Sequence, residues 1–319
     1  MKLGFVYAKR PYWPFWDWVC QAAVNLGHEA VRVHHVDDLM AADAECELML
    51  FEHRDCGIGW RQVRDHVEQR KSYWIQWNWD LAVTDFKPLK DQDYIERYGK
   101  SMRLFDACLV KEVDYLDQYA ELGINAHYCD QGVPSDIAAV QHQEVPAWDV
   151  LMFGQATPFY RRRRQVAMKL ADAGYRVGWA TESGEVPSGV ARLQWCHPSR
   201  LNWLMSNAKC VLDIDLRDCV SGYKSVRHWL IAGAGAIPIR DGSLGCSDAV
   251  DAAKVACAMT DGERADCGYA LRADVLRSHT NEKRLEWIIA NFGRSGNAVE
   301  QTMPDVFRQE DCDDKEQEW

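Results

Sequence analysis

The chain has 319 residues, of which 47% are hydrophobic and 27% are charged, and its formal net charge is −11. This length exceeds what one hydrophobic core usually supports and predicts two globular domains, while the negative charge disfavours broad, nonspecific binding to nucleic acids. No apolar run reaches the roughly 18 residues of a membrane span, and residues 1–13 lack the layout of a signal peptide, so we expect a cytoplasmic protein with no membrane partner.

Apolar runs and amphipathic segments alternate through the first part of the chain. Short runs rich in branched and aromatic residues predict strands, and apolar residues at helical spacing predict helices. The expected strands are 3–8, 30–33, 48–51, 73–77, 107–111 and 126–129, and the expected helices are 15–26, 60–69 and 113–122. Because strands that alternate with helices are typical of a parallel sheet, residues 1–140 predict a Rossmann-like domain.

The same alternation resumes after a polar stretch between Val133 and Trp148, where we place the domain boundary. The expected strands are 149–154, 175–180, 210–214 and 236–239, and the expected helices are 160–173, 198–207, 225–232, 265–277 and 282–292. Residues 141–300 therefore predict a second Rossmann-like domain, which faces the first across a cleft. Residues 301–319 end in a strongly acidic stretch and predict a disordered tail.

The twelve cysteines indicate neither a disulfide framework nor a metal site. None are spaced as CxxC, and a cytosolic chain keeps its thiols reduced. Cys20, Cys108, Cys210 and Cys257 lie in apolar surroundings, and we expect them in the core.

The segment 221–227, with the sequence SGYKSVR, follows an expected strand and precedes an apolar helix. Gly222 lets the backbone N–H groups around Tyr223 approach a ligand, and Ser225 is placed to cap the helix. The helix N-terminus adds partial positive charge, to which Lys224 and Arg227 add full charges. These features predict a site for a phosphate or diphosphate. The alternative is a capped surface helix with two solvated cations.

A second basic segment begins at Gly154, where another expected strand ends and the next helix starts with four arginines. Arg161 and Arg164 are one helical turn apart and can share a face. We expect Arg161 to reach the same anion from this separate helix. The alternative is a solvated basic surface.

These two segments resemble the C-terminal domain of GT-B glycosyltransferases, in particular the phage and spore-maturation-protein-like enzymes. The resemblance rests on DVLMFG followed by the arginine-rich helix, and on SGYKSVRHWLIAGAGAIPI. In that family the first strand of the domain ends in glycine, a basic residue on the next helix meets the donor phosphates, and a later loop and helix wrap the nucleotide-sugar. The matching residues here are Gly154, Arg161, Lys224, Ser225, Arg227, Gly233 and Gly235.

The resemblance implies a nucleotide-diphosphate sugar as co-substrate, with a UDP-sugar favoured, and no metal or other cofactor. It also implies that the anomeric configuration is retained. Lys224 and Arg227 would neutralise the leaving diphosphate and so act as catalytic residues. Many members carry a glutamate on this helix that binds the donor ribose, but Leu230 occupies that place here. The phosphate end of the donor is therefore better defined by the sequence than the nucleoside end.

The acceptor is expected on the N-terminal domain. The loop after its first strand carries Lys9, Arg10, Tyr12 and Trp13 at the carboxyl edge of the sheet, where ligands bind in such folds. Aromatic faces stack on sugars or bases, and cations contact phosphates. The alternative is that this loop packs on its own domain.

Two more groups of residues belong to the expected site. Trp77 and Asp80 follow the strand 73–77, so that Trp77 is placed to contact the acceptor and Asp80 to accept the proton of its hydroxyl. The alternative for Asp80 is a turn or helix cap. Asp130, Gln131 and Gly132 lie near the domain junction and are expected to contact the donor or form a hinge.

Together these features favour a glycosyltransferase. The resemblance includes phage enzymes that glycosylate 5-hydroxymethylpyrimidines in DNA, so double-stranded DNA is the favoured acceptor, and the host cytoplasm is the location of such an enzyme. A small-molecule or protein acceptor remains open, as does a non-catalytic nucleotide-sugar binding protein. A dehydrogenase is disfavoured because no GxGxxG follows the first strand. The sequence does not distinguish a monomer from a dimer.

Overall fold

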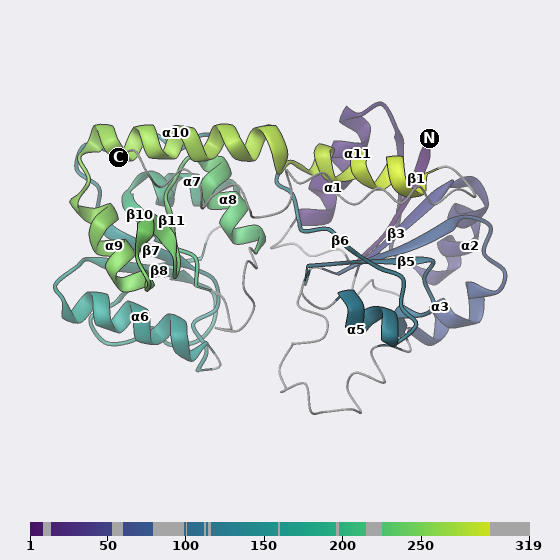
Figure 1. Cartoon of the computed structure of the whole chain (residues 1–319), viewed down its shortest axis with the longest axis horizontal. Coiled ribbons are helices and arrows are strands. Elements are labelled where there is room, and N and C mark those ends of the chain that lie inside the picture. Colours follow the sequence, from purple (N-terminus) through teal and green to yellow (C-terminus); the bar gives the residue numbers. More distant parts are fainter. Residues whose placement is uncertain are drawn as a thin grey trace. The chain divides into compact units, whose positions relative to one another are not determined.

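The computed structural model describes residues 1–8, 14–52, 60–78, 99, 101–111, 113, 116–158, 160–195, 198–214 and 225–293. These residues form two compact units, each built on its own parallel sheet (Figure 1). Unit 1 contains Met1–Ser135 together with the described chain from Thr280 onward, and unit 2 contains Asp136–His279. Both units have the Rossmann-like α/β architecture that the sequence predicts. Among the described helices, none combines the length and the hydropathy that a membrane crossing requires.

The sheet of unit 1 has six strands in the order β2-β1-β3-β4-β5-β6. Its strands are β1 (Lys2–Val6), β2 (Glu29–Val33), β3 (Leu48–Glu52), β4 (Tyr73–Trp77), β5 (Ala107–Val110) and β6 (Ala126–Tyr128). All neighbouring strands are parallel. Because the chain runs outward in one direction from β1 and in the other from β3, the sheet has its topological switch point between these two strands. Ligands of open α/β sheets bind at the carboxyl ends of the strands at such a point.

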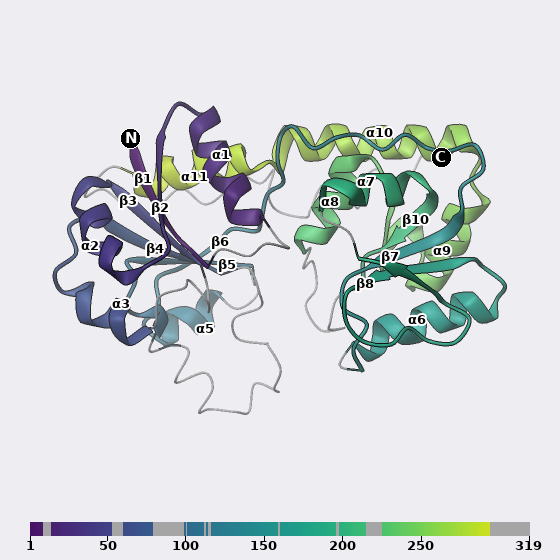
Figure 2. The same cartoon turned by 180° about the vertical axis from the view of Figure 1, so that it is seen from behind.

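Helices cover both faces of this sheet (Figure 2). One face carries α2 (Val36–Glu45), α3 (Trp60–Val67) and α5 (Leu116–Glu121), which pack into a core with alternate strand residues. The other face carries α1 (Phe15–Asn25) and α11 (Asn281–Phe292), which lie side by side. In α1, Phe15, Val19 and Ala22 recur at helical spacing and are buried against the sheet.

The helix α11 is the main departure from the expected domain division, which ran from 1 to 140 and from 141 to 300. The chain leaves unit 1 after Ser135 and returns to it at Thr280. The Asn281 N–H donates to the Val133 carbonyl oxygen at 2.8 Å, and Arg284 forms a buried ion pair with Asp130. The sequence pattern identified α11 as a helix, but helical periodicity does not state which sheet a helix covers.

The sheet of unit 2 has five parallel strands in the order β11-β10-β7-β8-β9. They are β7 (Trp148–Phe153), β8 (Val177–Thr181), β9 (Ala191–Gln194), β10 (Ala208–Leu212) and β11 (Pro238–Ile239). This is the dinucleotide-binding order, in which the first and fourth strands of the domain are neighbours. The switch point therefore lies between the carboxyl ends of β7 and β10.

The helices of unit 2 also form two layers (Figure 1). One layer consists of α6 (Arg161–Asp172) and α9 (Ala249–Ala258), and the other of α7 (Pro198–Ser206) and α8 (Val226–Ala234). The long helix α10 (Asp261–Ser278) packs on α8 and begins with a capping box formed by Thr260 and Glu263. A short 3₁₀ helix, η2 (Ser243–Gly245), precedes α9.

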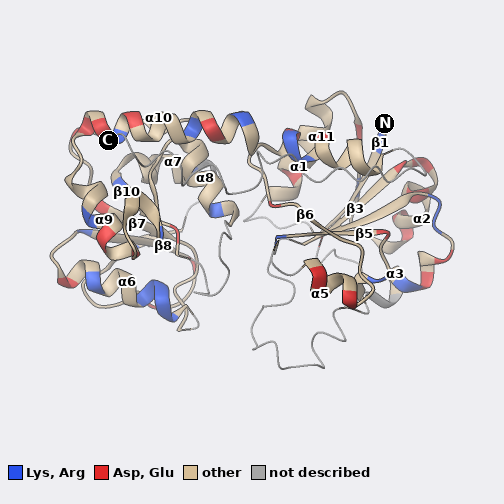
Figure 3. Ribbon diagram, in the orientation of Figure 1, with Lys and Arg blue, Asp and Glu red and all other residues tan. Residues whose placement is uncertain are grey.

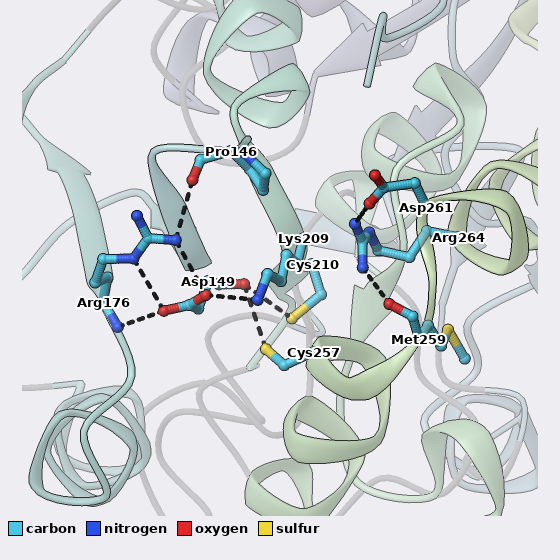
Figure 4. Close-up of polar contacts among 9 residues, drawn as sticks. All are labelled: Pro146, Asp149, Arg176, Lys209, Cys210, Cys257, Met259, Asp261 and Arg264. Carbon is cyan, nitrogen blue, oxygen red and sulfur yellow. Dashed lines mark hydrogen bonds and ion pairs between the residues drawn. The ribbon is translucent and has the colours of Figure 1, made fainter. Parts of the chain in front are cut away.

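A polar cluster around Asp149 joins three strands of unit 2 at the amino edge of its sheet (Figure 4). Asp149, near the start of β7, accepts from Arg176 Nε at 3.2 Å and lies 2.9 Å from Lys209 Nζ. Burial raises the pKa of the Asp149 carboxyl, but the hydrogen bonds from Arg176 and Lys209 outweigh it and hold that pKa well below its usual range. The cluster lies at the opposite end of the strands from the switch point, so its role is to hold the sheet together.

The sequence did not predict the helices α2 and α9 or the strand β9. Helix α9 is rich in alanine, and its start is marked by Asp248, whose side chain accepts from two backbone N–H groups. Strand β9 is a four-residue edge strand whose residues alternate between partly buried and exposed positions. Of the cysteines expected in the core, Cys20, Cys108 and Cys210 are buried, which confirms the expectation, whereas Cys257 is only partly buried.

Candidate anion site at the switch point of unit 2

The switch point of unit 2 is formed by two chain segments. Gly154 follows β7 with a φ of +112°, and Ile214 lies just beyond β10. A φ in this range is strained for residues with a side chain, which explains the glycine. The carbonyl oxygen of Gly154 accepts from the Trp179 indole at 2.9 Å, so this turn is fixed to the neighbouring strand β8.

Two guanidinium groups converge at this point. Arg163 Nε donates to the Ile214 carbonyl oxygen at 2.6 Å, and Arg227 Nη1 lies 3.5 Å from the same oxygen. A β-carbon built on Gly154 would be 3.4 Å from Arg227 Nη2 and 3.7 Å from Arg163 Nη1. Because Gly154 has no side chain, both guanidinium groups can lie close to its backbone.

Aromatic rings support the two guanidinium groups. Arg163 lies over the ring of Tyr160 at 4.3 Å from its centroid, and Arg227 lies over Phe153 at 5.6 Å. The Arg227 side chain is 17% exposed, and Arg163 is buried. Cations with this limited access to water act on a ligand in a lower dielectric, where a charge interaction is stronger than at the surface.

The four consecutive arginines form the basic start of α6 (Figure 3), and their side chains have different surroundings. The side chain of Arg161 is exposed, Arg162 forms an ion pair with Asp241, and Arg164 donates to the carbonyl oxygens of Ala156 and Glu185. Arg163 alone of the four is buried. The sequence led us to expect Arg161 at the anion site, whereas the structure brings Arg163 to Gly154.

The start of α8 is tied to the end of β10 by Asp213. Its carboxylate is fully buried and lies 3.0 Å from His228 Nδ1. Ser225 occupies the N-cap position of α8, as expected, but its hydroxyl donates to Asp213 at 3.4 Å and no side-chain cap bond to the helix is formed. Burial raises the pKa of Asp213, but its hydrogen bond with His228 and the nearby charges of Arg227 and Arg240 produce a net lowering.

This arrangement can hold an anion. Two guanidinium groups, the N-terminus of the nine-residue helix α8 and a side-chain-free turn at Gly154 meet at one switch point. Guanidinium groups bind phosphate oxygens through paired N–H donors, and a helix N-terminus adds unpaired backbone donors. No group of three or more His, Cys, Asp or Glu suited to a metal ion occurs among the residues that the structure describes.

Several residues expected at the site lie outside the described residues. They are Lys9, Arg10, Tyr12, Trp13, Asp80, Gly222, Tyr223 and Lys224, and the tail 301–319 lies outside them as well. The placement of these residues therefore stays a prediction.

Trp77, expected to contact the acceptor, is fully buried in unit 1. Its ring packs edge-on against Phe15 and Trp16 of α1, with centroids 6.3 and 5.9 Å away, and its indole N–H donates to the Cys129 carbonyl oxygen at 3.4 Å. In this position the ring supports the packing of α1 on the sheet and offers no exposed face for stacking.

The three residues expected at a hinge are buried within unit 1. Asp130 pairs with Arg284, and Gln131 Oε1 accepts from Lys111 Nζ at 2.8 Å. A β-carbon on Gly132 would come within 2.5 Å of the Thr280 backbone, so a glycine is required where the two crossing segments meet. These residues fix the point at which the chain leaves unit 1 and returns to it.

The comparisons with known proteins establish the fold. No protein-family profile and no curated protein matches the sequence. Among solved structures, the chain is similar to a DNA modifying enzyme, β-glucosyltransferase, determined with and without its substrate uridine diphosphoglucose. The TM-score is 0.59 at 12% identity, over 91% of this chain and 98% of that chain.

Two further solved structures have the same fold, one a glycosyltransferase and one a putative epimerase. The glycosyltransferase AviGT4 of avilamycin A biosynthesis gives a TM-score of 0.52 at 13% identity, over 91% of this chain and 96% of that chain. A putative UDP-N-acetylglucosamine 2-epimerase from Listeria monocytogenes gives 0.51 at 8% identity, over 95% of this chain and 99% of that chain. The chain thus has the two-domain fold of GT-B glycosyltransferases, a fold that more than one activity uses.

Sequence reasoning missed Arg163, Asp213 and His228 at this site. The helical spacing of α6 offered one signal for Arg163, because it lies three and seven positions before the buried Val166 and Leu170 and so shares their inward face. Asp213 offered another, since it directly follows three buried apolar residues at the end of β10. A buried carboxylate needs partners, and their identity came only from the fold.

Proposed function

We propose that the chain transfers a glycosyl group from a nucleotide-diphosphate sugar to an acceptor hydroxyl. The observation that carries this proposal is the meeting of Arg163 and Arg227 beside Gly154 at the switch point of unit 2. An open α/β sheet binds its ligand there, and two clustered guanidinium groups suit a diphosphate. The similarity to a glucosyltransferase that uses uridine diphosphoglucose supports a UDP-sugar as the donor.

The chemistry follows from the charge that develops during transfer. As the bond between the sugar and the diphosphate breaks, negative charge accumulates on the leaving oxygen, and the guanidinium groups stabilise it. We assign this role to Arg227 and Arg163, with Lys224, two residues before α8 in the sequence, as a further cation. Asp80 is proposed as the base that accepts the proton of the acceptor hydroxyl.

The acceptor we favour is a 5-hydroxymethylpyrimidine in double-stranded DNA. Its support is the sequence resemblance to phage enzymes with this substrate and the structural similarity to a DNA modifying glucosyltransferase. The segment 9–13, with Lys9, Arg10, Tyr12 and Trp13, would supply cations for phosphates and rings for a flipped base. A small-molecule or protein hydroxyl is the competing acceptor.

Donor binding is tested by titrating the protein with UDP and UDP-glucose in a calorimeter. Arg163→Met and Arg227→Met are each expected to weaken UDP binding by roughly tenfold or more, since a hydrogen bond between charged groups contributes about 1.5–3 kcal/mol. Lys169→Met is the matched control, because Lys169 lies on α6 with an exposed side chain. Equal affinity in all four proteins would remove the anion site from the proposal.

Transfer is tested by incubating the protein with UDP-glucose and duplexes that carry either 5-hydroxymethylcytosine or cytosine. The expected result is the addition of one hexose to the hydroxymethylated duplex alone, read by mass spectrometry, with binding that weakens as salt rises. The coupling constant of the anomeric proton in the product shows whether the configuration is retained, as the sequence resemblance implies. Conversion of a UDP-sugar without any acceptor would instead indicate an epimerase or hydrolase on the same fold.

A further inference from the structure

Asp213 has an unusual position for a carboxylate. It directly follows β10 at the switch point, its side chain has no exposed surface, and it lies beside a site that we assign to a diphosphate. A buried carboxylate costs free energy unless it is paired, and beside an anion it also repels the ligand. Its position therefore requires an explanation that outweighs both costs.

The side-chain contacts of Asp213 provide that explanation, because those within the described part of the chain come from the N-cap and first turn of α8. Oδ1 lies 3.9 Å from Arg227 Nη1 and accepts from the Ser225 hydroxyl at 3.4 Å, while Oδ2 lies 3.0 Å from His228 Nδ1. The Asp213 carboxylate, at the end of the central strand β10, thus contacts the N-cap residue and two first-turn residues of α8. The N-terminus of this helix faces the anion site.

The backbone next to Asp213 contributes to the same arrangement. The Asp213 N–H donates to the Ile239 carbonyl oxygen at 2.8 Å, which fixes its backbone to the neighbouring strand β11. The next carbonyl oxygen, that of Ile214, contacts both Arg163 and Arg227. The oxygen atoms that contact the two guanidinium groups therefore belong to two successive residues, Asp213 and Ile214, and the backbone of Asp213 is hydrogen-bonded to the sheet.

We propose that Asp213 is a positioning residue for the donor site, which sets the orientation of Arg227 and the start of α8 so that the guanidinium group faces Gly154. This inference rests on the proposed donor site. It assigns no contact between Asp213 and the ligand. The carboxylate acts through Arg227, whose flexible side chain would otherwise lose rotamer freedom each time a diphosphate binds.

The direction in which one substitution changes the affinity for UDP separates this role from a simple electrostatic one. Asp213→Asn keeps the size of the side chain and removes its negative charge. If Asp213 acted only through its charge, its removal would relieve repulsion and tighten the binding of UDP. If Asp213 positions Arg227, the same substitution weakens UDP binding, because the guanidinium group loses the partner that orients it. The net lowering of the Asp213 pKa by its hydrogen bond with His228 and by nearby cations, against burial, means that the charge is present at neutral pH.

The test is a double-mutant cycle on UDP affinity, measured by calorimetry with wild-type protein, Asp213→Asn, Arg227→Ala and the double variant. We expect Asp213→Asn to weaken UDP binding by about tenfold when Arg227 is present and to have little further effect when Arg227 is replaced. An unchanged or tighter affinity in Asp213→Asn overturns the inference. So does an equal loss in both backgrounds, which is the signature of a general structural effect.

Two controls keep the outcomes distinct. Circular dichroism and thermal unfolding of each variant show whether it folds, and if Asp213→Asn does not, Asp213→Glu takes its place in the cycle, since it keeps the charge and displaces the carboxylate. A loss that depends on Arg227 supports positioning in that case too, and a loss independent of Arg227 overturns it. If wild-type protein binds neither UDP nor UDP-glucose, the proposed donor site fails, which is a different result from a cycle that shows no coupling.

Discussion

The buried ion pair between Asp130 and Arg284 provides a direct test of how the returning helix α11 is held on unit 1. The Asp130 side chain is 5% exposed and that of Arg284 is 0% exposed. Removing one partner leaves the other charge buried without this ion pair, which costs about 3–5 kcal/mol. For a unit of this size, that cost corresponds to a fall in Tm of roughly 6–20 °C. We therefore expect Asp130→Asn and Arg284→Met each to lower the thermal stability of unit 1 strongly.

The matched control lies one residue away on the same helix. Lys283 pairs with Glu286 at 2.8 Å, but their side chains are 46% and 47% exposed, and exposed pairs contribute only about 0–1 kcal/mol. Lys283→Ala should therefore change the free energy of unfolding by less than about 1 kcal/mol. Calorimetric scans and urea unfolding followed by circular dichroism measure both effects.

The double variant sharpens the test. Replacing both partners, as Asp130→Asn with Arg284→Met, removes both charges and should cost less than the sum of the single substitutions. The reasoning is refuted if either single variant is no less stable than Lys283→Ala, because the buried ion pair would then contribute no more than an exposed one.

Three further predictions follow from local geometry. Gly132→Ala should destabilise unit 1 by a few kcal/mol in urea unfolding, because the added β-carbon would come within 2.5 Å of the Thr280 backbone. In the control Gly262→Ala the β-carbon meets nothing within 4 Å, so this change should be neutral or slightly stabilising, and similar stabilities of the two variants would contradict the prediction. Cys257, which is partly buried, should react with iodoacetamide faster than the buried Cys210; equal rates by mass spectrometry would count against this. The pKa of Asp149 is lower in the folded than in the unfolded protein. The stability that wild type has over Asp149→Asn should therefore be fully present above about pH 4 and decline as the pH falls further. A stability difference that stays constant down to pH ~2 would contradict this prediction.

Much of the fold could be predicted from the sequence because local patterns dictate it. The apolar runs at β1, β3, β4, β7 and β10 were evident, and their alternation with helices is typical of parallel sheets. The helix α2 was missed because its composition is acidic and its apolar face is narrow. The short strand β9 was missed because an edge strand is half-exposed and carries a weak apolar signal.

The candidate site was predicted less completely. The sequence pointed to Gly154, Ser225 and Arg227, which the structure places at one switch point. It also pointed to Trp77, whose ring lies in the core of unit 1 instead. An aromatic residue at the end of a strand fits both a binding surface and a core, and the helix that packs on that face of the sheet decides between them.

The sequence by itself determined that the segment 221–227 and the arginine-rich helix are basic and lie at strand ends, because composition and periodicity are local properties. Only the tertiary structure decided that Arg163 rather than Arg161 meets Arg227, that the Ile214 carbonyl oxygen contacts both guanidinium groups, and that Asp213 pairs with Arg227. The rotation of α6 about its axis is set by which of its faces packs against the strands, and β7 and β10 become neighbours only when the sheet forms. Long-range pairing of this kind leaves no mark on the spacing of residues along the chain.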